Sequence, residues 1–502
     1  MATFTATQAS VKNNKSIVTI NSGESVANVR QGDFLVIANF APSQITRAYV
    51  GGAGEQFIEL TVNWKHGDQT NQPAIVIPTT VEVRKAVTAL QSANVTVNDN
   101  FEAMQNWQTK TGTVIFTHID GTKTTVKTLP TILAETTAAA TGAINAVETR
   151  AQTAYREAVE AASSGKNTVK YDAQGNPNVM VWINKFNSED VNAAILARHG
   201  VDLQLGTGVF PAFIKNGVQM RGFWYAKYIA SAGASGGCSV VAGVQPRTSV
   251  NYDVAKALCT NKGTGWHLSA NIEWLAVAYL GLAFGEQPRG DTNYGRAHDA
   301  KHEVATRASA AHAPGDTGHS SSSYTGTGPA TWSHDGTQFG VFDMVGNVQE
   351  WQDQLKLQEG QIFAPLDNNP DMPEAQWPAH ECYFDSSGAT SGSVILNSLI
   401  TNRTGDLGDN GSGNGNNSNT WRTTAKDPSY VENLLMRQMG IEPPTGAILN
   451  GSIYSRNFGE RLPFRGGYWY DTTNAGLGAL GFYSARTGAN STIGFRPALF
   501  ES

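Results

Sequence analysis

The sequence predicts an α+β protein that is built mainly from short strands, with a helical segment between its two β-rich parts. Charged residues make up only 16% of the 502-residue chain, against about 25% in an average soluble protein. Glycine is abundant, with 52 residues, and this composition favours strands joined by turns. An Ala-rich texture with helical spacing is confined to residues 131–163.

The composition also excludes several classes of function. A net charge of −6 gives no basic field for nucleic acid, so no nucleic-acid partner is expected. The longest apolar run, "LAVAYLGLAF" at 275–284, is far shorter than the roughly 20 residues that span a bilayer, and the N-terminus lacks the pattern of a secretory signal. Three cysteines, Cys238, Cys259 and Cys382, form no disulfide framework. We therefore expect a large soluble protein, made in a reducing cytoplasm, without membrane insertion.

Residues 1–85 are predicted to form a β-rich domain. The runs "KSIVTI", "DFLVIANF", "QFIELTVNW" and "AIVIPT" are rich in β-branched and aromatic residues and are separated by Gly, Asp, Asn and Pro. Residues 86–130 follow as a mixed connector. It contains most of a predicted helix at 81–108 and a hairpin whose turn is Asp120-Gly121.

Residues 131–165 are predicted to form a helical oligomerisation segment. Small or aliphatic residues recur at alternating spacings of three and four, the pattern of a helix that packs against its own copies. The alternative is a single helix that lies on its own domain. The predicted seam comprises Leu133, Thr137, Ala140, Ile144, Val147, Ala151, Ala154, Ala158 and Ala161.

The C-terminal half is predicted to be one long domain that follows a linker. Residues 166–215 are assigned to this linker or neck, because "SSGKNTVKYDAQGNPN" at 163–178 is rich in Gly, Ser and Asn. The domain itself is assigned to 216–502. Within it, the low-complexity run at 404–420 is predicted to be a mobile surface loop.

Several blocks of the C-terminal domain occur in a recognisable order. A predicted strand "FWYAKY" at 223–228 is followed by a helix–turn–helix block at 249–280, and the later blocks are "GVFDMVGNVQEW" at 340–351, "GERLPFRGGYW" at 459–469 and "GFRPAL" at 494–499. This order resembles the C-type-lectin-like fold of the formylglycine-generating-enzyme branch. Within that branch it is most similar to the variable proteins of diversity-generating retroelements, of the phage tail-fibre type that includes the major tropism determinant.

The resemblance argues against catalysis. Formylglycine-generating enzymes use cysteine thiols in the C-terminal core, and residues 465–499 contain none. We therefore expect no enzyme activity, no catalytic residue and no cofactor. His298, His302 and Glu303 have a spacing compatible with zinc, but solvated histidines in a polar loop explain it equally well, so no metal site is assigned.

In the retroelement family, copying errors at adenines turn AAY codons into random NNY codons, which encode Tyr, Asp, Ser, Thr, Gly, Ala, Phe and Asn among others. Residues 465–499 fit this pattern, with a fixed Gly/Tyr-rich loop as the alternative. Tyr, Ser, Gly and Asn are also favoured in antibody binding sites. The positions assigned to the variable receptor-binding set are Tyr468, Tyr470, Asp471, Gly481, Tyr483, Ser484, Gly488, Asn490 and Thr492.

The remaining residues of these blocks are predicted to be scaffold. If "GGYWYD" is a strand, Trp469 points to the face opposite Tyr468 and Tyr470. Gly466 and Gly467 are expected to permit a tight turn or a close approach of the backbone. The scaffold set is Gly466, Gly467, Trp469, Arg486, Phe495, Arg496 and Trp351.

The resemblance implies a phage tail-fibre protein that binds a receptor on the host cell surface, either a protein or a glycan. It would act in the virion, where residues 1–85 attach to other tail or baseplate proteins and the helical segment forms a homotrimer. The alternatives are a retroelement variable protein displayed on a bacterial surface and, less favoured by the cysteine pattern, a formylglycine-generating-enzyme-like oxidase.

Overall fold

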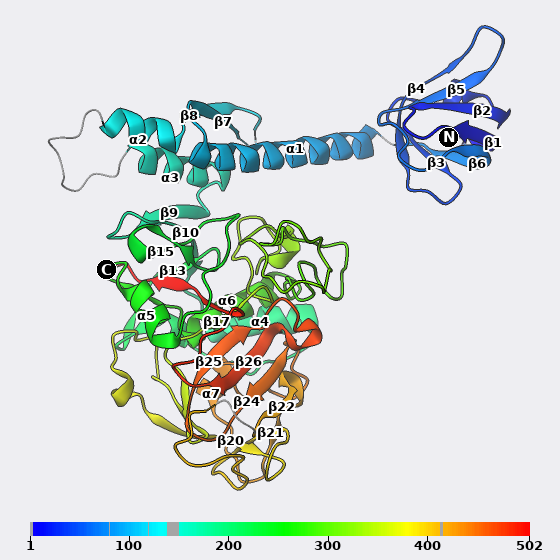
Figure 1. Cartoon of the computed structure of the whole chain (residues 1–502). Helices are drawn as coiled ribbons and strands as arrows, with labels where there is room; N and C mark the ends of the chain where they lie inside the picture. The colour runs from blue at the N-terminus through cyan, green and yellow to red at the C-terminus, as the bar shows by residue number, and fades with distance from the viewer. Residues whose placement is uncertain (1–3, 80, 119, 138–149, 412–414, 502) are drawn as a thin grey trace. The chain divides into compact units, whose positions relative to one another are not determined.

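The computed structural model of the chain describes residues 4–79, 81–118, 120–137, 150–411 and 415–501 (Figure 1). These residues fall into two compact units, Met1–Glu135 and Thr136–Ser502, which are described separately. The architecture is mixed α+β, with mostly strands and few helices, as the composition predicts.

The N-terminal unit begins with a closed six-stranded barrel, coloured blue in Figure 1, in the order β1-β2-β5-β4-β3-β6. Alternate residues of its strands point inward, so that Leu35 and Ile37 of "FLVI" are buried together with Val18 and Ile58. The predicted β-rich domain is therefore present. Its strands are β1 Thr5–Val11, β2 Ile17–Gly23, β3 Phe34–Ile37, β4 Ser43–Val50, β5 Gln56–Leu60 and β6 Gln69–Ile77.

A long helix and a hairpin follow the barrel, at the positions that the sequence predicts. Helix α1 spans Val81–Thr109, and strands β7 Thr113–Thr117 and β8 Lys123–Lys127 form the hairpin. Trp107 of the helix donates its indole N–H to the carbonyl of Lys127 at 2.9 Å. This bond fixes the end of the helix against the hairpin.

The predicted helical seam is only partly described. Helices α2 Leu129–Thr137 and α3 Arg150–Ala162 occupy its two ends. Ala140, Ile144 and Val147 lie outside the described residues. In α3 the buried side chains are Tyr155 and Val159, one position further along than the predicted seam residues Ala154 and Ala158. These buried positions of α3 are therefore displaced by one residue from the predicted seam.

The predicted linker at 166–215 is instead part of the folded C-terminal unit. Strands β9 Asn167–Tyr171 and β10 Pro177–Asn184 form one side of a five-stranded sheet of order β16-β28-β13-β10-β9. The Gly, Asn and Pro that indicated a linker form the tight turn between these two strands. The other strands of this sheet are β13 Gly222–Ala226, β16 Trp266–Leu268 and β28 Pro497–Leu499.

The helices of the C-terminal unit surround a large apolar core. In helix α6, Asn271–Phe284, nearly every side chain is buried, including Trp274, Leu275 and Val277, which explains why the longest apolar run of the sequence lies here. The other helices are α4 Ser188–His199, α5 Tyr252–Thr260 and α7 Leu434–Gln438. Within the described ranges, no helix combines the length and hydrophobicity needed to cross a membrane.

The second sheet of this unit has 11 strands and carries the C-terminal blocks of the sequence. Its main path runs β22-β24-β26-β25-β18-β19-β20-β21-β23, and β17 links β25 to β27. The bounds are β17 Gln349–Trp351, β18 Lys356–Gln358, β19 Gln361–Phe363, β20 Ala379–Ser386, β21 Val394–Asn397, β22 Asn417–Thr420, β23 Ala425–Lys426, β24 Ser452–Ser455, β25 Glu460–Gly466, β26 Gly476–Ser484 and β27 Ile493–Phe495.

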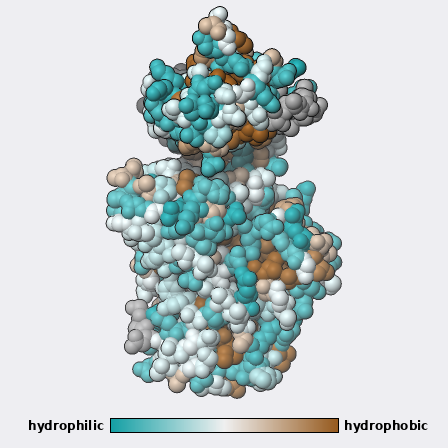
Figure 2. All heavy atoms as spheres, turned by 90° about the vertical axis from the view of Figure 1, so that its right-hand side faces the viewer, coloured by the Kyte–Doolittle hydropathy of each residue, from teal (hydrophilic) through white to brown (hydrophobic). Residues whose placement is uncertain are grey.

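Two short hairpins complete the unit, β11 Ile214–Lys215 with β12 Val218–Gln219, and β14 Ser231–Ala232 with β15 Cys238–Ser239. On the face drawn in Figure 2, hydrophilic and intermediate residues predominate and hydrophobic ones form separate patches. This agrees with the low charge and high content of uncharged polar residues in the sequence.

Candidate functional site

The predicted variable positions lie on the β25–β26 hairpin and on the loop after it, at one end of the second sheet. Strand β26 pairs antiparallel with β25, with Phe464 opposite Gly481, and parallel with β24, with Tyr454 opposite Gly481. Strand β22 pairs with the other side of β24. The predicted mobile loop at 404–420 thus ends in a paired strand that forms one edge of this surface.

The turn between β25 and β26 is set by two glycines. Gly466 and Gly467 have φ values of +91° and +77°, which side chains with a Cβ rarely adopt. A Cβ on Gly467 would lie 2.7 Å from the Cα of Ala475, and one on Gly466 would lie 2.7 Å from the carbonyl oxygen of Met344. Both glycines therefore permit a tight turn and a close approach, as the sequence predicts.

The next residues form a turn rather than the predicted strand, and they differ in burial. Trp469 is only 3% exposed and packs on Ile229 and Val348, whereas Tyr470 is 42% exposed. The backbone of Trp469 is held at both ends, because its N–H donates to Asn347 at 3.0 Å and its carbonyl accepts from Tyr294 at 2.6 Å. One aromatic side chain therefore anchors the turn while its neighbours face outward.

The predicted variable residues converge on one hollow with a volume of about 790 Å³. Eight of the nine line it, although they come from three separate stretches of the chain, and the exception is Gly488. Tyr470 and Asn490 are exposed, Gly481 and Thr492 are buried, and the others are half-buried. The eight residues are Tyr468, Tyr470, Asp471, Gly481, Tyr483, Ser484, Asn490 and Thr492.

Aromatic rings form two groups in this hollow. The rings of Tyr468 and Tyr470 meet edge to face with centroids 4.6 Å apart, and Tyr294 stacks on Tyr470 at 5.9 Å. The ring of Tyr483 lies 5.2 Å from that of Tyr454, and its phenol oxygen accepts a hydrogen bond from the side chain of Gln349. Tyr483 is therefore partly built into the scaffold, whereas Tyr470 is the most exposed of these phenols.

Asp471 is the acidic group of the predicted variable set. Its Oδ2 accepts the backbone N–H of Tyr468 at 3.1 Å, which closes the turn. Burial raises the pKa of the Asp471 carboxyl to about 6, and the hydrogen bonds from Tyr468 oppose this shift. The carboxyl therefore changes its charge close to neutral pH, inside a hollow that is otherwise lined mainly by uncharged groups.

A buried ion pair supports the sheet beneath this surface. Arg496 and Glu350 are both fully buried, with Nε–Oε2 and Nη2–Oε1 distances of 2.9 and 2.8 Å. The two Nη groups of Arg496 also donate to the carbonyls of Ala226 and Phe342, each at 2.9 Å. Burial raises the pKa of the Glu350 carboxyl, and the adjacent guanidinium acts against that shift.

The other scaffold residues are also anchored. Trp351 is fully buried and donates its indole N–H to the carbonyl of Val250 at 3.0 Å, and Phe495 is buried in the same cluster. Arg486 is half-buried and bonds the carboxylates of Glu460, Glu374 and Asp253, at distances from 2.6 to 2.9 Å. These contacts tie the loop after β26 to the rest of the unit.

Sequence reasoning missed several residues that line the same hollow. Tyr454 comes from β24, Arg456 directly follows this strand, and Gln349 comes from β17. Ser418 and its two successors come from the end of the low-complexity run. Alternation in "SIYS" indicates that Tyr454 faces away from the buried Ile453. Nothing in the sequence, however, indicates that β24 lies parallel to β26.

The cysteines are buried, and the candidate metal ligands His298 and Glu303 bond other side chains. All three cysteines are free and buried, and burial raises the pKa of each thiol, that of Cys382 to about 12. His298 bonds the hydroxyl of Thr292 at 2.8 Å, and Glu303 accepts from Trp332 at 2.9 Å. Among the residues that the structure describes, no group of three or more His, Cys, Asp or Glu is placed to hold a metal ion.

Comparison with known proteins identifies one domain. A comparison with curated protein sequences finds no match. Among solved structures, the "Major Tropism Determinant I1 Variant" is 11% identical, with 98% of this chain and 85% of that chain covered at a TM-score of 0.26. The "Major Tropism Determinant U1 Variant" is 12% identical, with 98% of this chain and 94% of that chain covered, also at a TM-score of 0.26. A TM-score of this size is too low to establish a shared overall arrangement.

The model of the sulfatase-modifying factor enzyme 1-like domain matches residues 202–397. This range contains the helix–turn–helix block and the "GNVQEW" block from which the same branch is predicted, and it ends before β24. Residues 202–397 therefore carry a domain similar to the sulfatase-modifying factor enzyme 1-like family, the formylglycine-generating-enzyme branch of the C-type-lectin-like fold.

Proposed function

We propose that this chain is a receptor-binding protein of a phage tail fibre, and that the hollow around Tyr468, Tyr470 and Tyr483 contacts a receptor on the host cell. A diversity-generating retroelement would exchange the side chains that line this hollow. The proposal concerns the C-terminal unit; virion attachment through residues 1–85 and assembly as a homotrimer are further parts of it.

One observation carries the proposal. The nine positions are predicted from the resemblance to retroelement variable proteins, and each holds a residue that is compatible with a randomised NNY codon. Eight of them line one hollow, and they come from 468–471, 481–484 and 490–492. A fixed Gly/Tyr-rich loop has no reason to direct these particular residues to a common surface, whereas a diversified binding site requires it.

The division between scaffold and surface supports the same proposal. Trp469, Phe495 and Arg496 are buried, and they hold the backbone through packing and internal hydrogen bonds. Tyr470 and Asn490 are exposed, so that their side chains can be exchanged at little cost in packing. Tyrosines supply a large contact area with few rotatable bonds, which suits a surface that is selected for binding.

The site chemistry favours binding over catalysis. Each described cysteine thiol is buried with a raised pKa, which disfavours the thiolate that oxidase chemistry of this branch requires. Asp471 and Arg456 line the hollow beside four tyrosines and several amides, without a paired nucleophile and base within the described residues. We therefore propose a non-enzymatic protein, whose weak single contacts gain strength from several copies acting together.

The genetic part of the proposal is tested by sequencing the DNA that flanks the gene. We expect a near copy of the 465–499 coding region beside a reverse-transcriptase gene, with differences between the copies confined to adenines of the template. Phage structural genes as neighbours support the tail-fibre assignment, whereas bacterial export genes support surface display on a bacterium. The absence of any template copy would contradict diversification.

A further inference from the structure

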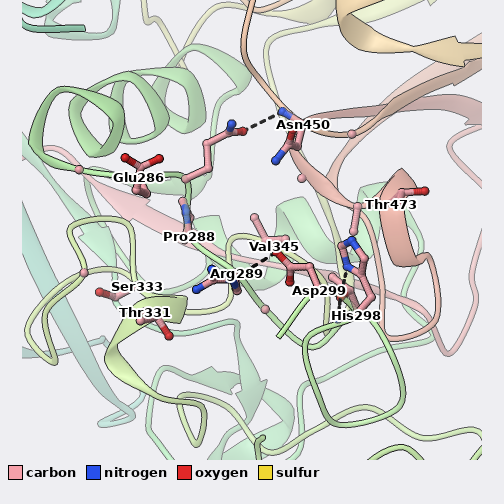
Figure 3. Close-up of a pocket in the computed structure, with 18 of the residues that line it drawn as sticks. Glu286, Pro288, Arg289, His298, Asp299, Thr331, Ser333, Val345, Asn450 and Thr473 are labelled. Carbon is pink, nitrogen blue, oxygen red and sulfur yellow. Dashed lines mark hydrogen bonds and ion pairs between the residues drawn. The ribbon is translucent and has the colours of Figure 1, made fainter. Parts of the chain in front are cut away.

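A second hollow of the C-terminal unit lies apart from the predicted variable positions. Its volume is about 710 Å³, within the range of about 300–1,000 Å³ that is typical of small-molecule sites. None of the nine predicted variable residues lines it. Figure 3 shows that its side chains come from the loop after α6 and from segments around Ser333, Asn450 and Thr473.

The walls of this hollow are held in place by hydrogen bonds between segments. Gln287 donates its amide to the carbonyl of Ile448 at 2.8 Å and accepts the backbone N–H of Asn450 at 2.7 Å, so that two distant loops are joined. The guanidinium of Arg289 bonds Asp299 at 3.2 Å and Glu303 at 3.1 Å. A ligand therefore meets a largely preformed site, which lowers the entropy cost of binding.

The lining combines polar and apolar surface and carries charges of both signs. Among the described residues that line it, there is no Phe, Tyr or Trp, and the only larger apolar side chains are Pro288 and Val345. Arg289 and Arg422 supply positive charge, while Glu286, Asp299 and Asp335 supply negative charge. An anion meets three carboxylates and a cation meets two guanidinium groups, so that the composition favours a ligand without net charge that has both polar and apolar faces.

Several hydrogen-bonding atoms on the walls remain open. The Oδ1 of Asn450 accepts from Arg422, but its amide nitrogen has no partner among the described residues. The Oδ1 of Asp299 and the Nε2 of His298 also have no hydrogen-bond partner among the described residues. The other carboxylate oxygen of Asp299 bonds Arg289, and the other ring nitrogen of His298 bonds Thr292. Figure 3 shows Asn450, Asp299 and His298 among the side chains that line this hollow.

We propose that this hollow is a binding site for a neutral saccharide, distinct from the diversified surface. Each sugar hydroxyl both donates and accepts a hydrogen bond, so that a saccharide matches carboxylate, imidazole and amide groups that lie close together without net charge. The proposal does not rest on the function proposed above, since the two hollows have different lining residues apart from Thr420.

The test uses the full-length protein and neutral trisaccharides of glucose, galactose, mannose and N-acetylglucosamine as probes, with binding followed by saturation-transfer NMR and calorimetry. Gly285 lines the hollow, and a Cβ there would meet no atom within 4 Å, so that position 285 accepts a side chain and Gly285→Trp is designed to obstruct the hollow. A melting temperature close to that of the unmodified protein shows that this variant keeps its fold. Asn450→Ala removes the open amide. Tyr470→Ala, in the other hollow, is the matched control.

We expect at least one of these trisaccharides to bind the unmodified protein. Binding should be lost in Gly285→Trp, weakened about tenfold in Asn450→Ala, and unchanged in Tyr470→Ala. The proposal is overturned if none of the probes binds at millimolar concentration, or if binding survives Gly285→Trp. Loss of saccharide binding in Tyr470→Ala alone would place the sugar in the diversified hollow and would equally overturn this assignment.

Discussion

Tyr468 and Tyr470 pack edge to face, with ring centroids 4.6 Å apart and an interplanar angle of 78°. The residue between them, Trp469, is buried against Ile229 and Val348. Three consecutive aromatic residues thus perform two roles, since two form the wall of a hollow and one fixes the turn that holds them. The predictions below separate these roles.

Trp469→Ala is expected to lower the free energy of unfolding by about 3–5 kcal/mol, because it empties a buried site between Ile229 and Val348. Urea unfolding followed by fluorescence measures this loss. Tyr470→Ala is the matched control and should change stability by less than about 1 kcal/mol, since its side chain is 42% exposed. The assignment of Trp469 to the scaffold is wrong if the two variants unfold at the same denaturant concentration.

Arg496→Met is expected to cost about 3–5 kcal/mol, because it leaves the buried Glu350 carboxylate without its partner. The double variant Glu350→Gln/Arg496→Met should be more stable than the sum of the single variants predicts, because it removes both charges. Urea unfolding of the unmodified protein, Arg496→Met, Glu350→Gln and the double variant gives the coupling free energy between the two side chains. Strictly additive losses would show that the two side chains do not act as a pair.

The sequence identifies these scaffold residues because burial follows from local pattern. Trp469 between two tyrosines, and Phe495 with Arg496 in "GFR", are hydrophobic or bonded polar residues in short strands and turns, and alternation alone indicates which side faces inward. The role of Gly466 and Gly467 is likewise predicted locally, because two consecutive glycines favour a tight turn. Such features depend on neighbours in the sequence.

Local sequence pattern does not predict features that depend on contacts between segments far apart in the sequence. Tyr454 enters the hollow because β24 lies parallel to β26. Tyr294 stacks on Tyr470 because the backbone of Tyr294 bonds that of Trp469. The sequence predicts a linker where strands β9 and β10 lie, because the residues of the turn between them resemble linker composition. The strand that pairs with β10, β13, begins about forty residues further along the chain. The predicted seam of α3 differs by one position from the buried residues Tyr155 and Val159.

Asp471 predicts a pH dependence of stability. Burial raises the pKa of its carboxyl to about 6 in the folded protein, whereas an unfolded chain ionises near the ordinary value of 3.8. The folded state therefore holds the proton to a higher pH, and the contribution of this group to stability falls as the pH rises from about 4 to about 6.

Asp471→Asn should remove this contribution, so that the free energies of unfolding of the two proteins diverge by about 2 kcal/mol across that window in favour of the variant. Unfolding measured at several pH values tests the prediction. Burial also raises the pKa of the Asp343 carboxyl to about 6, so Asp343 contributes to the pH dependence of both proteins. Subtracting the free energy of unfolding of one protein from that of the other removes this shared contribution. A constant difference from pH 4 to pH 7 would show that Asp471 titrates normally.

Assembly is predicted from the seam at 133–161, and part of that seam lies outside the described residues. We expect the full-length protein to sediment as a homotrimer at micromolar concentration. Ala158→Glu and Ala161→Glu place charges on the predicted seam, and should shift the protein toward monomer if this face packs against copies of itself. Ala162→Glu, at an exposed position outside the seam, is the control. A monomeric unmodified protein would contradict the prediction.

The central claim is that the hollow around Tyr468 and Tyr470 contacts the receptor, and binding of the full-length protein to host cells tests it most directly. Tyr468→Ala/Tyr470→Ala should weaken cell binding at least about thirtyfold, since aromatic residues at the centre of an interface commonly contribute 2 kcal/mol or more. Tyr383→Ala, at a half-buried tyrosine of β20 outside the hollow, should bind as the unmodified protein does. If the double variant keeps its fold and still binds cells with unchanged affinity, the receptor contacts another surface and the account is wrong.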